Sequence, residues 1–187
     1  MQRNILVLLG LTLGLLNSIS GRYTTGDCPP VDRISELDIQ RYFGKWYEQY
    51  RGGLFQPEGQ ICTTANYSQR EDGTIKVINR GINPNGKIGG AEGTLTCKNS
   101  SNCEVKFFWY APAGPYWVLD TDYENYTVVY TCSSYVGILR LDNIWILART
   151  PEIQVDVQKI FSFIEERVPD YPLTELKKTN QTNCAYE

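Results

Sequence analysis

The sequence predicts an all-β domain, a sandwich or a barrel, with one helix packed against its outside. Between Gly44 and Thr150 the chain consists of runs rich in Tyr, Val, Ile, Thr, Phe and Trp. Turn sequences such as residues 83–86 and 111–115 separate these runs. Short runs at this regular spacing are typical of β-sandwiches and β-barrels. There are eight of them, beginning near Lys45, Ile61, Thr74, Ile88, Glu104, Tyr116, Asn125 and Leu141.

Two helical segments flank the predicted strands. Residues 37–43 read as a short helical turn that leads into the first strand, and Pro151 is expected to open a second helix that reaches about Arg167. Pro169 and Pro172 end this second helix because proline cannot continue it. Its apolar residues follow the i, i+3, i+4 spacing of a helix that buries one face, so we expect it to lie against the strands. The apolar face consists of Ile153, Val157, Ile160, Phe161, Ile164 and Val168.

The first residues indicate a secreted protein. Arg3 precedes an apolar run over residues 5–16, and small residues follow it, which is the pattern of a signal peptide cleaved near Gly21. The apolar run is too short for a permanent membrane-spanning helix. We therefore expect a signal peptide over residues 1–20 and a single extracellular domain over residues 21–187.

Charge and cysteine content narrow the class further. The formal net charge is −3 at pH 7, which gives no electrostatic attraction to nucleic acid or to an anionic membrane. An even number of cysteines in an oxidising compartment predicts three disulfides, although six cysteines allow 15 pairings. The sequence contains no histidine and no C-x-x-C, so we expect no metal site. The six cysteines are Cys28, Cys62, Cys97, Cys103, Cys132 and Cys184.

Four N-x-[ST] sequons predict an N-glycosylated protein, provided that they are exposed. They begin at Asn66, Asn99, Asn125 and Asn180. The short spacing between Cys97 and Cys103 indicates a disulfide across a hairpin turn.

Three separated motifs point to a family. Gly44-Lys45-Trp46 opens the first predicted strand, Thr121-Asp122-Tyr123 lies at the turn after the sixth, and Arg149 ends the eighth. In this order they resemble the G-x-W, T-D-Y and terminal-arginine motifs of lipocalins, in the branch of apolipoprotein D, bilin-binding protein and insecticyanin. The resemblance implies an eight-stranded antiparallel up-and-down β-barrel with the helix outside it. It also implies that Trp46 and Arg149 stack at the closed end in a structural role, which suits cation–π attraction.

The same resemblance implies two of the disulfides. Cys28 would join Cys132, and Cys62 would join Cys184. In the chain-entropy model, closing loops of this length stabilises the fold by up to about 4–5 kcal/mol each. A Cys97–Cys103 bridge would be an addition to the usual pair of the branch.

Alternation along the strands predicts which side chains face the interior. If Trp46 points inward, Glu48 and Tyr50 on the same strand point inward too. In the same way, an inward Arg149 implies that Leu147, Trp145 and Asn143 point inward. The resulting interior is apolar with a few polar groups, which is the composition of a small-molecule pocket. A packed core is the alternative, but an unpartnered Glu48 would be costly there. The predicted ligand-binding residues are Glu48, Tyr50, Tyr67, Val77, Asn79, Phe107, Trp109, Asn143, Trp145 and Leu147.

These features predict a secreted carrier of a small hydrophobic ligand such as a bilin, fatty acid, retinoid or steroid. No cofactor is required, apart from a bilin chromophore as one form of cargo. Haem lacks its usual axial ligands, since histidine is absent and the one methionine is Met1. The absence of histidine and the pairing of the cysteines also argue against an enzyme, leaving Glu48 as the one candidate for an isomerase.

The predicted loops at the open end carry apolar residues, at Leu54-Phe55 and over residues 135–139. They would either contact a membrane or lipoprotein surface or fold over the mouth as a lid. A glycoprotein that acts mainly through such protein or membrane contacts is the alternative to a carrier.

Overall fold

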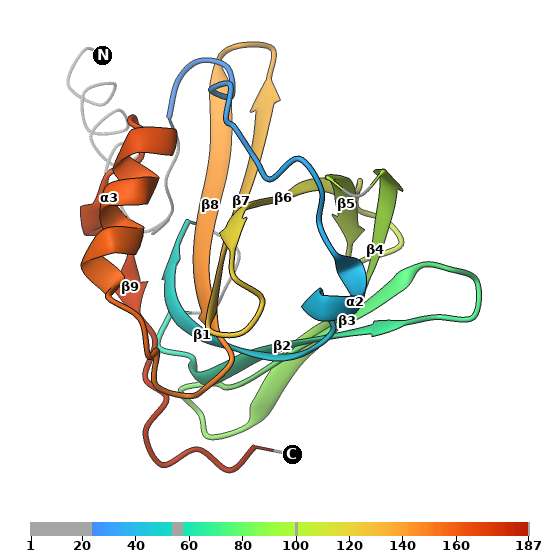
Figure 1. The fold of residues 1–187 in the computed structure, drawn as a ribbon, viewed down its shortest axis with the longest axis vertical. Helices are drawn as coiled ribbons and strands as arrows, with labels where there is room; N and C mark the ends of the chain where they lie inside the picture. Colours follow the sequence, from blue (N-terminus) through green and yellow to red (C-terminus); the bar gives the residue numbers. More distant parts are fainter. Residues whose placement is uncertain (1–23, 54–57, 100, 187) are drawn as a thin grey trace, which may run out of the picture.

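Eight antiparallel strands follow one another around a closed barrel, seen as a ring in Figure 1. β1 pairs with β8 on one side and with β2 on the other, which closes the sheet on itself. This computed structural model describes residues 24–53, 58–99 and 101–186, so the predicted signal peptide and Leu54-Phe55 lie outside the described residues. The barrel prediction is confirmed. The strands are β1 Gly44–Gly52, β2 Ile61–Gln69, β3 Ile75–Ile82, β4 Ile88–Asn99, β5 Asn102–Lys106, β6 Gly114–Thr121, β7 Tyr126–Tyr135 and β8 Leu139–Ala148.

Two α-helices of the described residues lie where the sequence places them, and both are shorter than predicted. α2 spans Ile39–Tyr42 and α3 spans Val157–Arg167. The prediction that Pro151 opens α3 is wrong. Asp156 is the N-cap, because its side chain accepts a hydrogen bond from Gln158 N, whereas Ile153 N donates to Gln49 Oε1 on β1. Residues 151–155 are therefore a connection that runs along the barrel before the helix begins.

α3 packs against the outside of the barrel, as expected. Its Ile160 and Ile164 are buried against the outer face of β7 and β8, where Ile144 and Ile146 are fully buried. A second apolar cluster fills the inside of the barrel, and Trp46 and Leu95 are fully buried in it. Strand residues divide between the two clusters because side chains alternate between the faces of a strand. None of the helices in the described ranges is long and apolar enough to span a bilayer.

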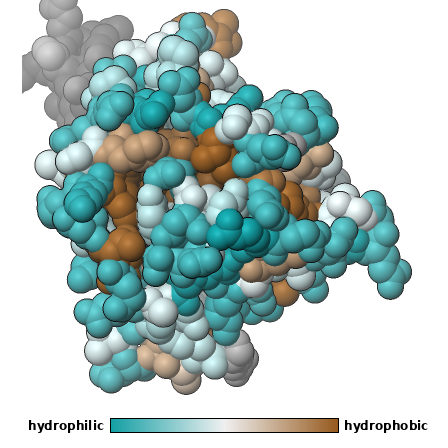
Figure 2. Space-filling view, viewed as in Figure 1, coloured by the Kyte–Doolittle hydropathy of each residue, from teal (hydrophilic) through white to brown (hydrophobic). Residues whose placement is uncertain are grey.

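The segment before α2 runs along the barrel from one end to the other. Thr24 bridges to Arg140 at the start of β8, and Ile34 N donates to Val118 O on β6. Leu37 then enters the inner cluster with 3% of its surface exposed. In Figure 2 apolar side chains gather along this segment and beside α3, while polar side chains cover most of the remaining face.

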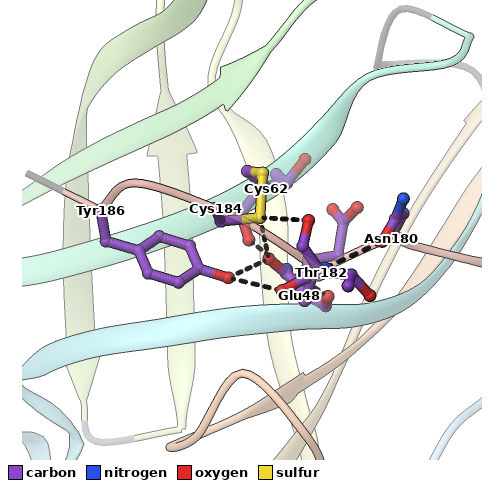
Figure 3. The surroundings of a disulfide bond; sticks show 8 residues. Glu48, Cys62, Asn180, Thr182, Cys184 and Tyr186 are labelled. Carbon is purple, nitrogen blue, oxygen red and sulfur yellow. Dashed lines mark hydrogen bonds between the residues drawn. A yellow bond between two sulfur atoms is a disulfide. The ribbon is translucent and has the colours of Figure 1, made fainter.

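The C-terminal tail closes a gap between β1 and β2, as Figure 3 shows. After the 3-10 turn η2 (Leu173–Glu175), β9 (Lys177–Lys178) pairs with the end of β1. Thr179 N donates to Gln49 O on β1, and Cys62 N on β2 donates to Asn180 O. Gln181 Nε2 donates to both strands, at Glu48 O and Thr63 O. The tail thus acts as an additional strand where β1 and β2 diverge.

Three disulfides join the pairs that the resemblance and the hairpin spacing imply. Cys28–Cys132 ties the N-terminal segment to β7, Cys62–Cys184 ties β2 to the tail, and Cys97–Cys103 links β4 to β5. None of the six cysteines is free. The first two disulfides join cysteines that are 104 and 122 residues apart in the sequence.

Candidate ligand site in the barrel interior

The floor of the barrel is closed by Arg149 lying over Trp46. The guanidinium carbon is 3.7 Å from the centre of the Trp46 ring, a close cation–π contact. The same guanidinium donates to three backbone carbonyls, those of Tyr123 at 2.9 Å, Lys45 at 3.2 Å and Arg41 at 2.7 Å. Arg149 therefore ties together β1, the end of α2 and the turn between β6 and β7.

The glycine of the G-x-W motif makes room for this arrangement. Gly44 has φ of +97°, in the left-handed region that favours glycine, and a Cβ there would lie 3.4 Å from Arg149 Nη1. Two residues on, Trp46 Nε1 donates to Tyr42 O at 2.9 Å, so the buried indole is hydrogen-bonded. Both motif residues have structural roles here.

The T-D-Y motif builds the neighbouring turn. Asp122 Oδ1 accepts hydrogen bonds from the backbone N–H groups of Glu124, Asn125 and Tyr126. Burial tends to raise the pKa of Asp122, but the hydrogen bonds from Asn125 and from these N–H groups outweigh it and leave the pKa lowered. Thr121 Oγ1 donates to Tyr126 O at 2.7 Å across the same turn.

The hydroxyl groups of three buried tyrosines form hydrogen bonds with one another just above the floor. Tyr116 Oη lies 2.9 Å from Tyr42 Oη and 2.8 Å from Tyr67 Oη, and Tyr42 Oη also contacts Thr127 Oγ1 at 3.3 Å. Burial raises the pKa of Tyr42 to about 12 and raises the pKa values of Tyr67 and Tyr116 well above their usual range. All three phenols are therefore neutral at physiological pH.

Most of the predicted wall residues face the interior. Some belong to the inner apolar cluster or pack against it, and Glu48 pairs across strands with one of them, Leu147. Asn79 and Asn143 follow by alternation along β3 and β8. That these side chains contact a ligand stays a prediction. The inward residues are Glu48, Tyr67, Val77, Asn79, Phe107, Asn143, Trp145 and Leu147.

Tyr50 does not line the interior, so that prediction is wrong. The pairing of β1 with β8 shifts register between Glu48 and Tyr50, which is a β-bulge. The extra residue turns Tyr50 outward, where its ring packs edge-on against Phe161 of α3 with 5.1 Å between centroids. The same bulge turns Arg51 inward, opposite Trp145.

Trp109 is also misplaced by the prediction. β5 ends at Lys106, so Trp109 lies in the connection to β6 and 88% of its surface is exposed. Side chains alternate between the two faces only along extended backbone, so the alternation through Val105 and Phe107 does not extend to Trp109. Phe107 itself packs against the inner cluster, above Gly93, where a Cβ would lie 2.7 Å from its ring.

Glu48 has partners that the sequence did not reveal. Arg51 Nη1 lies 3.2 Å from Glu48 Oε1, and Thr179 Oγ1 of the tail donates to the same oxygen at 2.6 Å. Glu48 is 1% exposed. The expectation that an unpartnered carboxylate demands a ligand is therefore wrong. The bulge and the inserted tail supply the partners, and neither follows from strand periodicity.

The rim at the open end carries exposed apolar side chains. In an up-and-down barrel the β5–β6 and β7–β8 connections lie at the same end, opposite the β6–β7 turn that contacts Arg149. At this end Trp109 is 88%, Tyr110 69%, Val136 94% and Ile138 72% exposed. These side chains are therefore largely exposed to solvent.

The predicted sequons all begin at exposed residues, namely Asn66, Asn99, Asn125 and Asn180. Their glycosylation remains a prediction. Within the described ranges no group of three or more Cys, Asp or Glu side chains is arranged to hold a metal ion.

Comparison with known proteins agrees with this geometry. The model of the Lipocalin-like domain family matches residues 37–181. The chain is 38% identical over 189 residues to apolipoprotein D of Macaca fascicularis and 33% identical over 186 residues to that of Bos taurus, covering 96% of each pair of chains.

Two solved structures share the fold. Lobster apocrustacyanin A1 superimposes with a TM-score of 0.73 at 22% identity, covering 86% of this chain and 92% of the other. Insecticyanin from the tobacco hornworm Manduca sexta gives a TM-score of 0.72 at 20% identity, covering 86% and 89%. At these identities the likeness shows the fold alone.

Proposed function

Because the chain belongs to the lipocalin family, we propose that it is a carrier that binds a small hydrophobic ligand inside its barrel. The observation that carries this proposal is the inner face of the barrel. It presents apolar side chains around most of its circumference and a few polar ones on one side. Apolar burial supplies affinity in such sites, while sparse polar groups orient the ligand. A bilin, retinoid, steroid or fatty acid fits this description.

We place the carrier outside the cell. Three disulfides close the fold, and disulfides persist in oxidising compartments. A catalytic role has little support, because every cysteine is paired and the sequence contains no histidine. Glu48, the one acidic candidate, is engaged by Arg51 and Thr179 of the protein itself.

The exposed rim supports a further part of this proposal, contact with a phospholipid surface during loading or release. Trp109 and Tyr110 have amphipathic rings of the kind that concentrate at membrane–water interfaces, and Val136 and Ile138 extend the apolar area. A lid would bury these side chains over the mouth, whereas here they are exposed. Surface contact is therefore favoured over a lid.

A titration of the purified protein with retinol, arachidonate and biliverdin, followed by calorimetry, tests the carrier proposal. We expect saturable binding of at least one of them. Val77→Phe narrows the interior and should weaken that binding, while Ile78→Phe on the neighbouring outward position is the matched control. Saturable binding to none of these apolar ligands, with both variants folded, would contradict the proposal.

A further inference from the structure

The inner face of the barrel has one polar side and one apolar side. Glu48 and Arg51 of β1, Thr179 of the tail and Thr63 of β2 lie next to one another around the barrel. Asn143 on the adjoining β8, whose side chain lies against Gly53 just after β1, continues this polar side. The opposite side, formed by β3 to β7, is mainly apolar, although Asn79 of β3 is also inward. The inward apolar residues of this side are Val77, Leu95, Val105, Phe107, Val118 and Val129.

Thr63 is the part of the polar side that the protein leaves unsatisfied. Its side chain is 3% exposed, and its Oγ1 has no hydrogen-bond partner among the described residues. Alternation along β2 places it on the same inward face as Ala65 and Tyr67, which belong to the inner cluster. A buried hydroxyl without a partner is unfavourable and calls for an explanation, and a polar group of a bound ligand would supply the missing partner.

The charges beside Thr63 decide what kind of ligand group fits. Glu48 and Arg51 form a buried ion pair, 2% and 15% exposed at their side chains, whose charges cancel. A ligand carboxylate here would add a second buried negative charge next to Glu48 with one guanidinium to compensate two carboxylates. A neutral hydroxyl or carbonyl oxygen adds no charge and can hydrogen-bond to Thr63 Oγ1.

We propose that the barrel takes a neutral amphiphile, whose hydroxyl or carbonyl group hydrogen-bonds to Thr63 while its apolar body lies against β3 to β7. This inference rests on the proposed carrier function and names the ligand class. It favours alcohols, ketones and esters over carboxylates, and it makes Thr63 and Glu48 the residues that set this preference.

The test measures displacement of the neutral fluorescent probe N-phenyl-1-naphthylamine by three ligands with matched chains, oleyl alcohol, oleate and 1-octadecene. In the unaltered protein at pH 7.4, we expect oleyl alcohol to bind about 10-fold more tightly than either of the others, the size of one buried hydrogen bond or one unfavourable charge. Equal affinities, or oleate binding most tightly, would overturn the inference while leaving the carrier function intact. Failure of the probe and all three ligands to bind would refute the carrier function itself and the inference with it.

Variants at Thr63 separate a binding role from a structural one. Thr63→Val keeps the shape and removes the hydroxyl, so it should lower the affinity for oleyl alcohol about 10-fold and leave that for 1-octadecene unchanged. It should also raise the melting temperature of the ligand-free protein, because the unsatisfied hydroxyl is gone. Thr63→Ser keeps the hydroxyl and should retain the preference for the alcohol. Loss of stability in Thr63→Val without loss of the preference would count against the proposal.

Glu48→Gln tests the charge argument independently. Glu48→Gln removes one negative charge beside Thr63 and keeps Arg51, so the preference should shift from oleyl alcohol towards oleate by about 10-fold or more. An unchanged ranking in a folded Glu48→Gln variant would show that the ion pair does not set the ligand class.

Discussion

The two ends of the barrel differ in their side chains: the closed end carries hydrogen-bonded polar groups, and the open end carries exposed apolar ones. At the closed end, the polar groups of the motif residues and of the buried tyrosines each make several hydrogen bonds: Arg149 donates to three carbonyls, Asp122 accepts from three N–H groups, and the Tyr116 hydroxyl contacts two other hydroxyls. At the open end, Trp109 and Val136 are almost wholly exposed. Satisfied polar groups make the closed end rigid, whereas the open end is left available for contacts with other molecules.

The difference explains which residues carry motifs. The G-x-W, T-D-Y and terminal-arginine residues all belong to the closed end, where each makes several contacts that a substitution would break. Between the two ends lies the polar side around Glu48 and Thr63. There the Glu48 carboxylate accepts a hydrogen bond, as polar groups at the closed end do, whereas the Thr63 hydroxyl has no hydrogen-bond partner among the described residues. The motifs therefore specify the fold, and ligand preference depends on residues outside them.

The largest effect should come from breaking the closed end at Arg149. Arg149→Met removes the cation–π contact with Trp46 and leaves the carbonyls of Arg41, Lys45 and Tyr123 without this donor. We expect a loss of about 3 kcal/mol in the free energy of unfolding, measured by urea denaturation. Arg167→Met is the matched control. That arginine lies over Phe163 but is 36% exposed and pairs with a surface aspartate, so its loss should cost less than about 1 kcal/mol.

A smaller effect should come from ionising the tyrosines above the floor. The pKa of Tyr42 is raised from 10.0 to about 12, so the folded state holds its proton more tightly than the unfolded state. The stability from the neutral phenol is complete below pH 10 and is lost as pH rises through about 12. For one such group, the rise from 10.0 to about 12 corresponds to a full loss of about 2.7 kcal/mol in the free energy of unfolding.

Urea unfolding at pH 8 and at steps up to pH 12 would measure this decline. In Tyr42→Phe the decline should be shallower, because the group with the linked proton is gone, although stability at pH 8 should fall through the loss of hydrogen bonds to Tyr116 and Thr127. An equally steep alkaline decline in the variant would assign the effect to other groups.

The sequence predicts the closed end far better than the interior or the rim. Every strand begins within two residues of its predicted start, and Trp46 and Arg149 stack as the resemblance implies. Strand periodicity predicts facing only while the strand stays regular. One extra residue after Glu48 turns Tyr50 outward and Arg51 into the interior. The sequence pattern does not reveal such a bulge.

Long-range partners were also invisible in the sequence. Thr179 reaches Glu48 across 131 residues because Cys184 anchors the tail to Cys62. The disulfide was expected, but its consequence, a tail strand inserted between β1 and β2, depends on three-dimensional geometry. Trp109 was misplaced for a simpler reason, since β5 ends three residues before it and aromatic residues in a loop resemble those of a strand.

The smallest effect on stability, and the sharpest contrast with the closed end, should come from the rim. In Trp109→Ser/Val136→Ser both side chains are already 88% and 94% exposed, so the free energy of unfolding should change by less than about 0.5 kcal/mol. Binding to neutral phosphatidylcholine vesicles, measured by co-flotation, should nevertheless fall several-fold because the apolar contacts with lipid are lost. The control, Lys76→Ser/Thr96→Ser, changes the outer surface away from the rim and should leave flotation unchanged. If the rim variant floats as well as the unaltered protein, the exposed side chains serve some purpose other than lipid contact, and the open end is a mouth without a docking surface.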